Sequence, residues 1–117
     1  MKKILVVDDD IDALSVLDLV LTHHNFIVKT ISKWQSVSKA IESFNPDIIL
    51  LDIDLRGADG GEICKKLKES KETQDVPVIL CSVLMPEDYL TACNAQGFLT
   101  KPLETSDLLK IIKDNLN

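Results

Sequence analysis

The sequence predicts an α/β fold: a three-layer, doubly wound domain with a five-stranded parallel sheet and five helices. Short apolar runs alternate with segments of helical periodicity five times along the 117 residues, with no internal repeat and no linker. Residues 48–51 form a continuous run of four large apolar side chains, which is typical of a strand covered on both faces. Strands joined through helices in this way are expected to lie parallel, with right-handed crossovers. A chain of this length has room for one core, so we expect a single domain over residues 1–117.

The five strands are marked by apolar runs that end at turn residues or charges. They are expected over residues 4–7, 26–31, 48–51, 76–81 and 97–100. The helices are marked by apolar residues at helical spacing, and they are expected over residues 11–24, 32–44, 59–68, 86–93 and 108–116. Ser32, with Gln35 three residues later, suggests a capping box for the second helix. Residues 54–61, which contain three glycines and no apolar periodicity, are expected to form a loop.

The charge balance argues against a nucleic-acid-binding protein. Thirteen Lys and Arg residues stand against nineteen Asp and Glu residues, which gives a net charge of −6, and the sequence contains no basic cluster. Binding to a phosphate backbone needs the opposite pattern. We therefore expect no direct contact with nucleic acid.

The N-terminus and the cysteines indicate a cytoplasmic protein. The apolar run that follows Lys2 and Lys3 ends at Asp8 after four residues, which is too short for a signal peptide or a membrane span. The three cysteines have no CxxC spacing, so a disulfide framework or a zinc site is not expected. A reducing compartment is the simpler interpretation, and no membrane association is expected.

Five polar side chains follow the predicted strands at the points where the strands end. Asp8 and Asp9 follow the first strand, and Asp52 follows the third. Ser82 ends the fourth strand and Lys101 follows the fifth. Because parallel strands have their carboxyl ends at the same edge, we expect these side chains to converge where open α/β sheets bind ligands. Each residue alone has a simpler explanation, as a helix cap, a turn residue or a solvated charge, but five at one edge indicate a site.

The chemistry of these side chains points to the transfer of a phosphoryl group. Two carboxylates about 4 Å apart repel each other by about 4 kcal/mol at an effective dielectric constant of about 20. Mg²⁺, which prefers carboxylate and phosphate oxygens, would relieve this repulsion. With the metal on one side and the Lys101 ammonium on the other, the charge of a phosphoryl group arriving at Asp52 would be neutralised from two directions. Asp52 would be the nucleophile, and Ser82 could donate its hydroxyl to a phosphoryl oxygen.

Four motifs carry a resemblance to a known family. They are VVDDD at 6–10, LLDID followed by DG at 50–60, the Ser that ends VILCS, and FLTKP at 98–102. In this order and approximate spacing they resemble the receiver domain of two-component response regulators, in the single-domain form of the chemotaxis regulators. The resemblance spans essentially the whole chain. It implies the flavodoxin-like strand order 2-1-3-4-5.

The resemblance also implies roles for individual residues. Asp52 would accept a phosphoryl group from a histidine kinase or a phosphotransfer protein, with Lys101 and Ser82 beside it. The ligands of Mg²⁺ would be Asp8, Asp9, Asp52 and the backbone carbonyl of Asp54. Ser82 and Phe98 are similar to the family's switch pair, in which a hydroxyl turns towards the phosphate and an aromatic ring turns inward behind it. The bond between Lys101 and Pro102 is expected to be cis.

A receiver domain is expected to be a signalling protein and not an enzyme, because it catalyses only its own phosphorylation and dephosphorylation. Its expected partners are the phosphodonor protein and a downstream protein target, which is contacted through a face that phosphorylation switches. The resemblance also allows for a phosphorylation-dependent dimer. Between Ser82 and Lys101 the chain is a few residues shorter than in better-known members, so we expect a shortened fourth helix on the face that usually carries output.

Two other interpretations stay open at this stage. The residues from Asp52 to Asp54 also match the start of the DxDx(T/V) signature of haloacid-dehalogenase-type phosphatases, in which the first Asp is the nucleophile and the second is a general acid. Against this enzyme interpretation, Arg56 replaces Thr or Val, the motif lies on the third strand instead of the first, and no cap domain fits. The other interpretation is a pseudo-receiver, a binding module with a vestigial site. The complete set of acceptor, metal-ligand and lysine positions argues against it.

Overall fold

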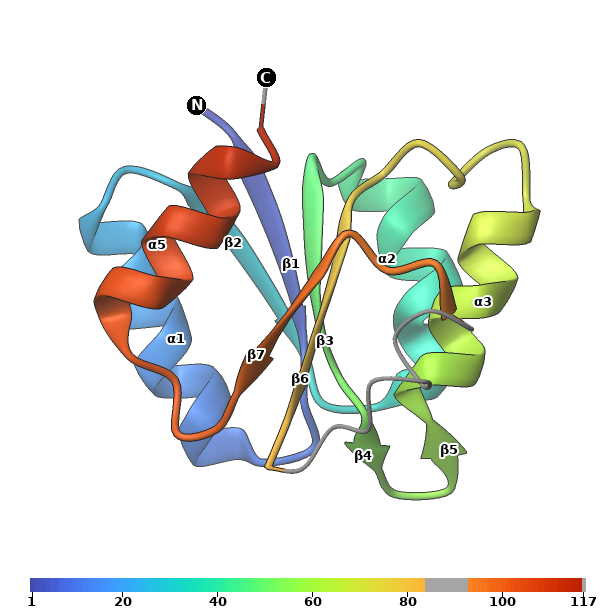
Figure 1. Ribbon diagram of the computed structural model, residues 1–117, viewed down its shortest axis with the longest axis horizontal. Helices are drawn as coiled ribbons and strands as arrows, with labels where there is room; N and C mark the ends of the chain where they lie inside the picture. The colour runs from blue at the N-terminus through green and yellow to red at the C-terminus, as the bar shows by residue number, and fades with distance from the viewer. Residues whose placement is uncertain (84–92, 117) are drawn as a thin grey trace.

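Five parallel strands form the central sheet of the protein, which we describe from a computed structural model over residues 1–83 and 93–116 (Figure 1). Neighbouring strands pair in parallel throughout this sheet. Their spatial order is β2 (Ile27–Ile31), β1 (Lys3–Val7), β3 (Ile48–Asp52), β6 (Val78–Ser82) and β7 (Gly97–Thr100). The predicted order 2-1-3-4-5 is therefore confirmed, with β6 and β7 as the fourth and fifth strands of the sheet.

Helices cover both faces of the sheet. In the described part of the chain the α-helices are α1 (Ile11–His23), α2 (Val37–Phe44), α3 (Gly60–Glu69) and α5 (Thr105–Asp114). Figure 1 shows α1 and α5 on one face and α2 and α3 on the other, which confirms the three-layer architecture. The predicted short helix over residues 86–93 falls almost entirely on residues 84–92, outside the described residues, so a fifth helix stays a prediction. Among the described helices, none is both long enough and apolar enough to cross a bilayer.

The strands are apolar at almost every position because alternate side chains contribute to two separate cores. Ile4 and Val6 of β1 belong to the cluster beneath α1 and α5, whereas Leu5 and Val7 belong to the cluster beneath α2 and α3. All four side chains are at most 1% exposed. Burial of a side chain of this size contributes about 1.5–3 kcal/mol. The doubly covered sheet therefore holds the strand ends, and the residues that follow them, in fixed positions.

Short polar side chains define several helix ends. Asp10 caps α1 by accepting hydrogen bonds from the N–H groups of Asp12 and Ala13. Asp59 caps α3 by accepting a hydrogen bond from the N–H group of Gly61. Asn25, Asn45 and Asn94 have positive φ angles of 70°, 55° and 57°. Asparagine tolerates this left-handed conformation better than most residues, so Asn25 and Asn45 let the chain turn out of α1 and α2 without glycine.

The predicted capping box at the start of the second helix is wrong. The chain instead forms a 3-10 turn, η1 (Trp34–Ser36), with Lys33 before it and no side-chain cap, and α2 begins only at Val37. The Ser36 N–H donates to the Lys33 carbonyl, which closes the tighter turn. Trp34 and Val37 both pack against the core beneath α2 and α3. Packing of these two side chains, and not a cap at Ser32, therefore fixes where this helical segment starts.

The predicted loop over residues 54–61 is also wrong in part, because it contains a small antiparallel hairpin. Its strands are β4 (Asp54–Leu55) and β5 (Ala58–Asp59). Gly57 lies in the two-residue turn with a φ of 79°, which glycine adopts without strain. Gly60 then starts α3 so close to β3 that a Cβ atom there would lie 2.7 Å from the Cα of Ile53. The hairpin therefore folds back directly over the carboxyl end of β3.

Candidate functional site

Three carboxylates converge at the carboxyl ends of β1 and β3. Asp8 and Asp9 follow β1, and Asp52 is the last residue of β3. One carboxylate oxygen from each residue lies within 4.8 Å of the others. Asp8 and Asp52 are each only 4% exposed, whereas a quarter of the Asp9 side chain is open to solvent. The convergence expected from the sequence is therefore present, with Asp9 on the open side.

Lys101, the residue after β7, supplies the cation of this cluster. Its Nζ lies 2.9 Å from Asp8 Oδ2 and 3.3 Å from Asp52 Oδ1. Burial disfavours the ammonium, but the hydrogen bond to Asp8 and the charges of Asp52 and Asp8 outweigh that cost, so the pKa of Lys101 lies above its ordinary value. The peptide bond between Lys101 and Pro102 is cis, as predicted. The side chain is therefore a permanent positive charge between two buried acids.

The charge state of Asp52 is set by its surroundings. Burial, followed in size by the charge of Asp8, raises the pKa of Asp52 from 3.8 to about 6. The charge of Lys101 and the hydrogen bond that the Asp54 N–H donates to Asp52 Oδ1, at 3.3 Å, partly offset this rise. Asp52 is therefore a carboxylate at neutral pH, although burial and the negative charge of Asp8 disfavour its ionised form.

The β4–β5 hairpin closes one side of the cluster. The Arg56 N–H donates to Asp9 Oδ2 at 3.0 Å, which anchors the turn of the hairpin to the acidic site. The Arg56 side chain is 94% exposed, and its Nε lies 3.9 Å from the same Asp9 oxygen. An exposed ion pair of this length contributes little to stability. The hairpin is thus held mainly by its backbone, and the guanidinium adds a positive charge beside the opening.

Ser82, the last residue of β6, is 2% exposed and lies next to the hairpin. Its hydroxyl donates to Asp54 Oδ2 at 3.1 Å. The sequence indicated Ser82 as a site residue, and it indicated Asp54 as a metal ligand through its backbone carbonyl or, in the phosphatase interpretation, as a general acid. It did not indicate a contact between these two side chains. The side-chain contact was missed because it depends on the hairpin, which folds Asp54 back towards β6. The role of the Asp54 carbonyl as a metal ligand stays a prediction.

Residues 4–113 match the family model described as the response regulator receiver domain. The chain belongs to this family. Because receiver domains are signalling domains, this membership favours a phosphoacceptor over the phosphatase that the Asp52 motif also allowed. Receiver domains interact with histidine kinases or phosphotransfer proteins and with downstream targets.

Individual relatives agree with this assignment. The receiver domain is 35% identical over 105 residues to the response regulator PleD of Caulobacter vibrioides, covering 87% of this chain and 23% of that protein. It is 32% identical over 117 residues to the phosphate regulon transcriptional regulatory protein PhoB of Rhizobium meliloti, covering 97% of this chain and 51% of that protein. The chain thus spans about a quarter and about half of these two relatives.

A solved structure supports the fold. The chemotaxis protein CheY4 of Vibrio cholerae superposes on the receiver domain with a TM-score of 0.92, over 99% of both chains, at 23% sequence identity. At this sequence identity the structural similarity supports the backbone fold alone. The same arrangement of strands therefore occurs with a largely different set of side chains.

The third residue of the Asp8–Asp10 run has a different task in the receiver domain. The Asp10 N–H donates to Asp8 Oδ1 at 2.9 Å, while the Asp10 carboxylate caps α1. Asp10 is therefore turned away from the cluster that Asp8 and Asp9 form with Asp52. The simpler explanation for an Asp after a strand, a helix cap, holds here for Asp10 alone.

Phe98, the aromatic residue of the predicted switch pair, lies on β7 and is 45% exposed. The register pairs Phe98 with Leu80 and Thr100 with Ser82. Phe98 therefore lies two residues before Thr100, which is the strand neighbour of Ser82. Residues separated by two in a strand project to the same face of the sheet. The register is therefore compatible with a coupling between Ser82 and Phe98, which stays a prediction.

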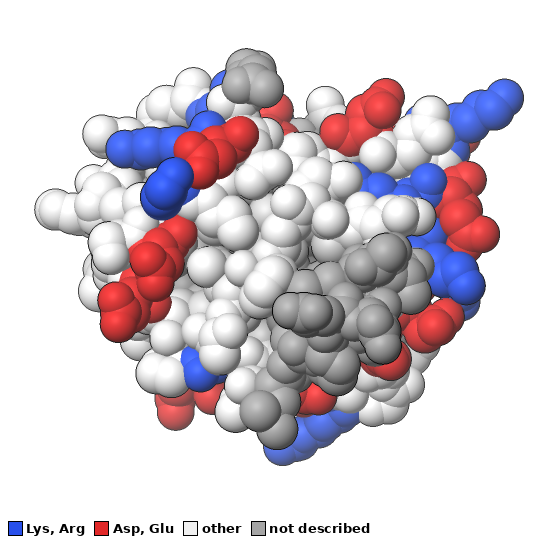
Figure 2. Space-filling view, viewed as in Figure 1, with Lys and Arg blue, Asp and Glu red and all other residues white. Residues whose placement is uncertain are grey.

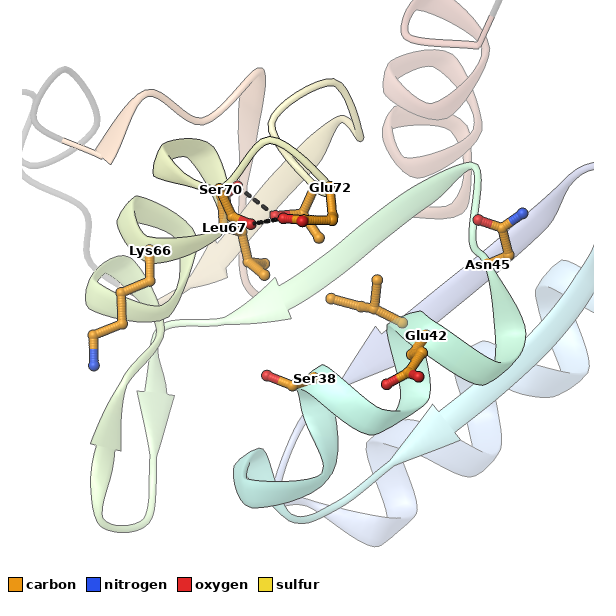
Figure 3. Close-up of a pocket in the computed structure, with 9 residues that line it drawn as sticks. Ser38, Glu42, Asn45, Lys66, Leu67, Ser70 and Glu72 are labelled. Carbon is orange, nitrogen blue, oxygen red and sulfur yellow. Dashed lines mark hydrogen bonds between the residues drawn. The ribbon is translucent and has the colours of Figure 1, made fainter.

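Surface shape does not single out the site, but its chemistry does. Asp9 lines two hollows, one of about 350 Å³ with the hairpin and one of about 580 Å³ with η1 and the start of α1. Another hollow of about 580 Å³ opens between α2 and α3 (Figure 3), and the described residues that line it include none of the acidic cluster. On the face seen in Figure 2, the acidic and basic side chains of the described residues are interspersed along the edges and form no patch of one sign.

Proposed function

We propose that Asp52 accepts a phosphoryl group from a phosphohistidine of a histidine kinase or of a phosphotransfer protein. One observation carries this proposal: the buried Asp52 carboxylate lies within 3.3 Å of the Lys101 ammonium and shares its site with two further acids. A group placed in this way is a nucleophile with a fixed cation beside it. Membership of the receiver family supports the same reaction.

The reaction requires a displacement at phosphorus. An oxygen of the Asp52 carboxylate forms a bond to phosphorus while the bond between phosphorus and the donor imidazole breaks, and the electron pair of that bond stays on the imidazole. With its pKa at about 6, Asp52 is mainly ionised at neutral pH and can attack. The Lys101 ammonium lies where it can balance charge that moves onto the phosphoryl oxygens. Release of the Ser82 hydroxyl from Asp54 would let it donate to one of those oxygens.

The acidic cluster fits Mg²⁺ by the chemistry of its donor atoms. Asp8, Asp9 and Asp52 offer hard carboxylate oxygens, and Asp9 leaves an open side for water and a phosphate oxygen. In the proposal these three residues and the Asp54 carbonyl would hold the ion. When bound, Mg²⁺ supplies positive charge that offsets the carboxylates and the phosphoryl oxygens.

We further propose that phosphorylation acts on protein partners. Ser82 and Phe98 would transmit the change to the face that includes β7 and α5, where a downstream target binds or a dimer forms. The chain would act as one receiver domain over residues 1–117, with no direct binding to nucleic acid. A cytoplasmic location is part of the proposal, and the three free cysteines, all buried, are in keeping with it.

The proposal is tested by incubation with a small phosphodonor such as acetyl phosphate, followed by intact mass spectrometry. In the presence of Mg²⁺ the protein should gain the mass of one phosphoryl group. The Asp52→Asn variant, and the native protein in EDTA, should gain none. A native protein that gains no phosphoryl group, from the small donor or from a phosphorylated phosphotransfer protein, would instead indicate a pseudo-receiver.

A further inference from the structure

We propose that the Asp54 carboxylate restrains the switch, because it holds the Ser82 hydroxyl away from the position in which that hydroxyl would bind a phosphoryl oxygen. This inference rests on the proposed function of Asp52. Asp54 is then a positioning residue that acts through Ser82. It sets how readily a phosphoryl group on Asp52 can draw the switch into its active arrangement.

The contact joins two parts of the site that are far apart in sequence. Ser82 and Asp54 are 28 residues apart, and the Ser82 Oγ lies 3.1 Å from Asp54 Oδ2. Ser82 is fixed at the end of a buried strand, where its carbonyl accepts a hydrogen bond from the Lys101 N–H at 2.9 Å. A hydrogen bond to a carboxylate is stronger than one between neutral groups. The restraint is therefore a specific bond between β6 and the hairpin.

Asp54 is in turn held in place by the hairpin. Its N–H donates to Asp52 Oδ1 at 3.3 Å, and its backbone pairs with Asp59 across the turn. The neighbouring Arg56 N–H is bonded to Asp9. The carboxylate that binds Ser82 is thus attached to the same backbone that contacts Asp52 and Asp9, so a change at the acidic cluster acts directly on it.

The two acceptors compete for one proton. A serine hydroxyl has a single O–H, which it can direct fully to only one acceptor at a time. When Ser82 donates to a phosphoryl oxygen on Asp52, it has to release Asp54, whose carboxylate then loses a donor. The Asp54 charge also repels the phosphoryl oxygens, independently of Ser82. An experiment therefore has to separate the competition for the hydroxyl from this simple charge repulsion.

A double-mutant cycle makes this separation. The probe is beryllofluoride, BeF₃⁻, which adds to an aspartate carboxylate in the geometry of a phosphoryl group, and its affinity is measured by titration in excess Mg²⁺ with ¹⁹F NMR. Asp54→Ala is compared with the native residue in three backgrounds: Ser82, Ser82→Ala and Ser82→Thr. Charge repulsion is relieved by Asp54→Ala in every background, whereas release of the hydroxyl occurs only where a hydroxyl is present. Circular dichroism spectra establish that each variant is folded.

We expect Asp54→Ala to increase the affinity for BeF₃⁻ more with Ser82 than with Ser82→Ala, by a further factor on the order of fivefold, as for one hydrogen bond. The conservative Ser82→Thr variant should restore this extra gain. An equal gain in affinity for BeF₃⁻ in all three backgrounds would overturn the proposed restraint and show that Asp54 acts only by charge repulsion. Native protein that binds no BeF₃⁻ in Mg²⁺ would overturn the proposed function, and the inference with it, so the two failures are distinguishable.

Discussion

At the scale of single residues, Asp52 lies where burial and the charge of Asp8 disfavour its ionised form. Its pKa of about 6, against an ordinary value of 3.8, means that the folded protein binds a proton at this carboxyl more tightly than the unfolded chain does. Stability is therefore expected to fall as the pH rises from about 4 to about 6, where the folded state holds more protons than the unfolded state. Above that range the ionised carboxylate is a constant cost to the fold.

Asp52→Asn should accordingly stabilise the protein at pH 7.5 in EDTA, by about 1–3 kcal/mol for a shift of this size. The difference should be much smaller near pH 4, where Asp52 is neutral in the native protein. Urea unfolding at the two pH values measures both quantities. Glu42→Gln, at an exposed position, is the control and should change stability little at either pH. A stabilisation of equal size at both pH values would contradict the electrostatic explanation.

Asp9 and Asp10 are neighbours in sequence with different tasks, and this difference can be tested. Asp9 belongs to the acidic cluster, so Asp9→Ala should abolish Mg²⁺ binding and phosphorylation. Asp10 caps α1, so Asp10→Ala should cost about 1 kcal/mol of stability and leave phosphorylation intact. Mg²⁺ titration and intact mass spectrometry give the readouts. Undiminished phosphorylation of Asp9→Ala in Mg²⁺ would remove Asp9 from the metal site.

Among the structural elements, the β4–β5 hairpin depends on the close approach of Gly60 to β3. A methyl group at this position would collide with the backbone of Asp52 and Ile53, which cannot rotate away. Gly60→Ala should therefore reduce stability by about 1–3 kcal/mol, as for an overpacked core, and slow phosphorylation by displacing Asp52. Gly97→Ala is a matched control, because its methyl group would meet the movable end of Ile111, 2.7 Å away. A larger loss of stability in Gly97→Ala than in Gly60→Ala would contradict this interpretation.

Strand β6 carries the switch hydroxyl, and its effect on other elements is also testable. Ser82→Ala should still accept a phosphoryl group on Asp52, because the nucleophile and Lys101 are unchanged. It should fail to transmit the change to β7 and α5, which hydrogen exchange of these segments before and after phosphorylation would measure. A phosphorylation-dependent change in exchange as large as that of the native protein would exclude Ser82 as the relay.

The elements differ in how far the sequence predicts them. The run from Ile48 to Leu51 is buried on both faces, so hydrophobicity alone identifies this strand and places Asp52 at its end. The hairpin strands have two residues each and no periodicity, and their pairing depends on how α3 meets β3. The bond between Ser82 and Asp54 could not be predicted for the same reason, because its geometry exists only once the hairpin is folded.

In the molecule as a whole, assembly of the sheet brings together site residues that are far apart in the sequence. Asp8 and Lys101 are 93 residues apart in sequence, and their strands are separated by β3 and β6, yet their side chains are 2.9 Å apart. The sequence could predict this meeting because parallel strands bring their carboxyl ends to one edge. The distances could not be predicted, since they depend on the register of four strands and on which side chains turn inward.

The role of Asp52 as the phosphoacceptor is tested most directly by locating the phosphoryl group chemically. The protein is phosphorylated in Mg²⁺ and reduced with borohydride, which converts an aspartyl phosphate into homoserine, and the peptides are then sequenced by mass spectrometry. Homoserine should appear at position 52 and at no other position. Homoserine at Asp8, Asp9 or Asp54, or a phosphorylated protein that yields no homoserine, would contradict the assignment of Asp52.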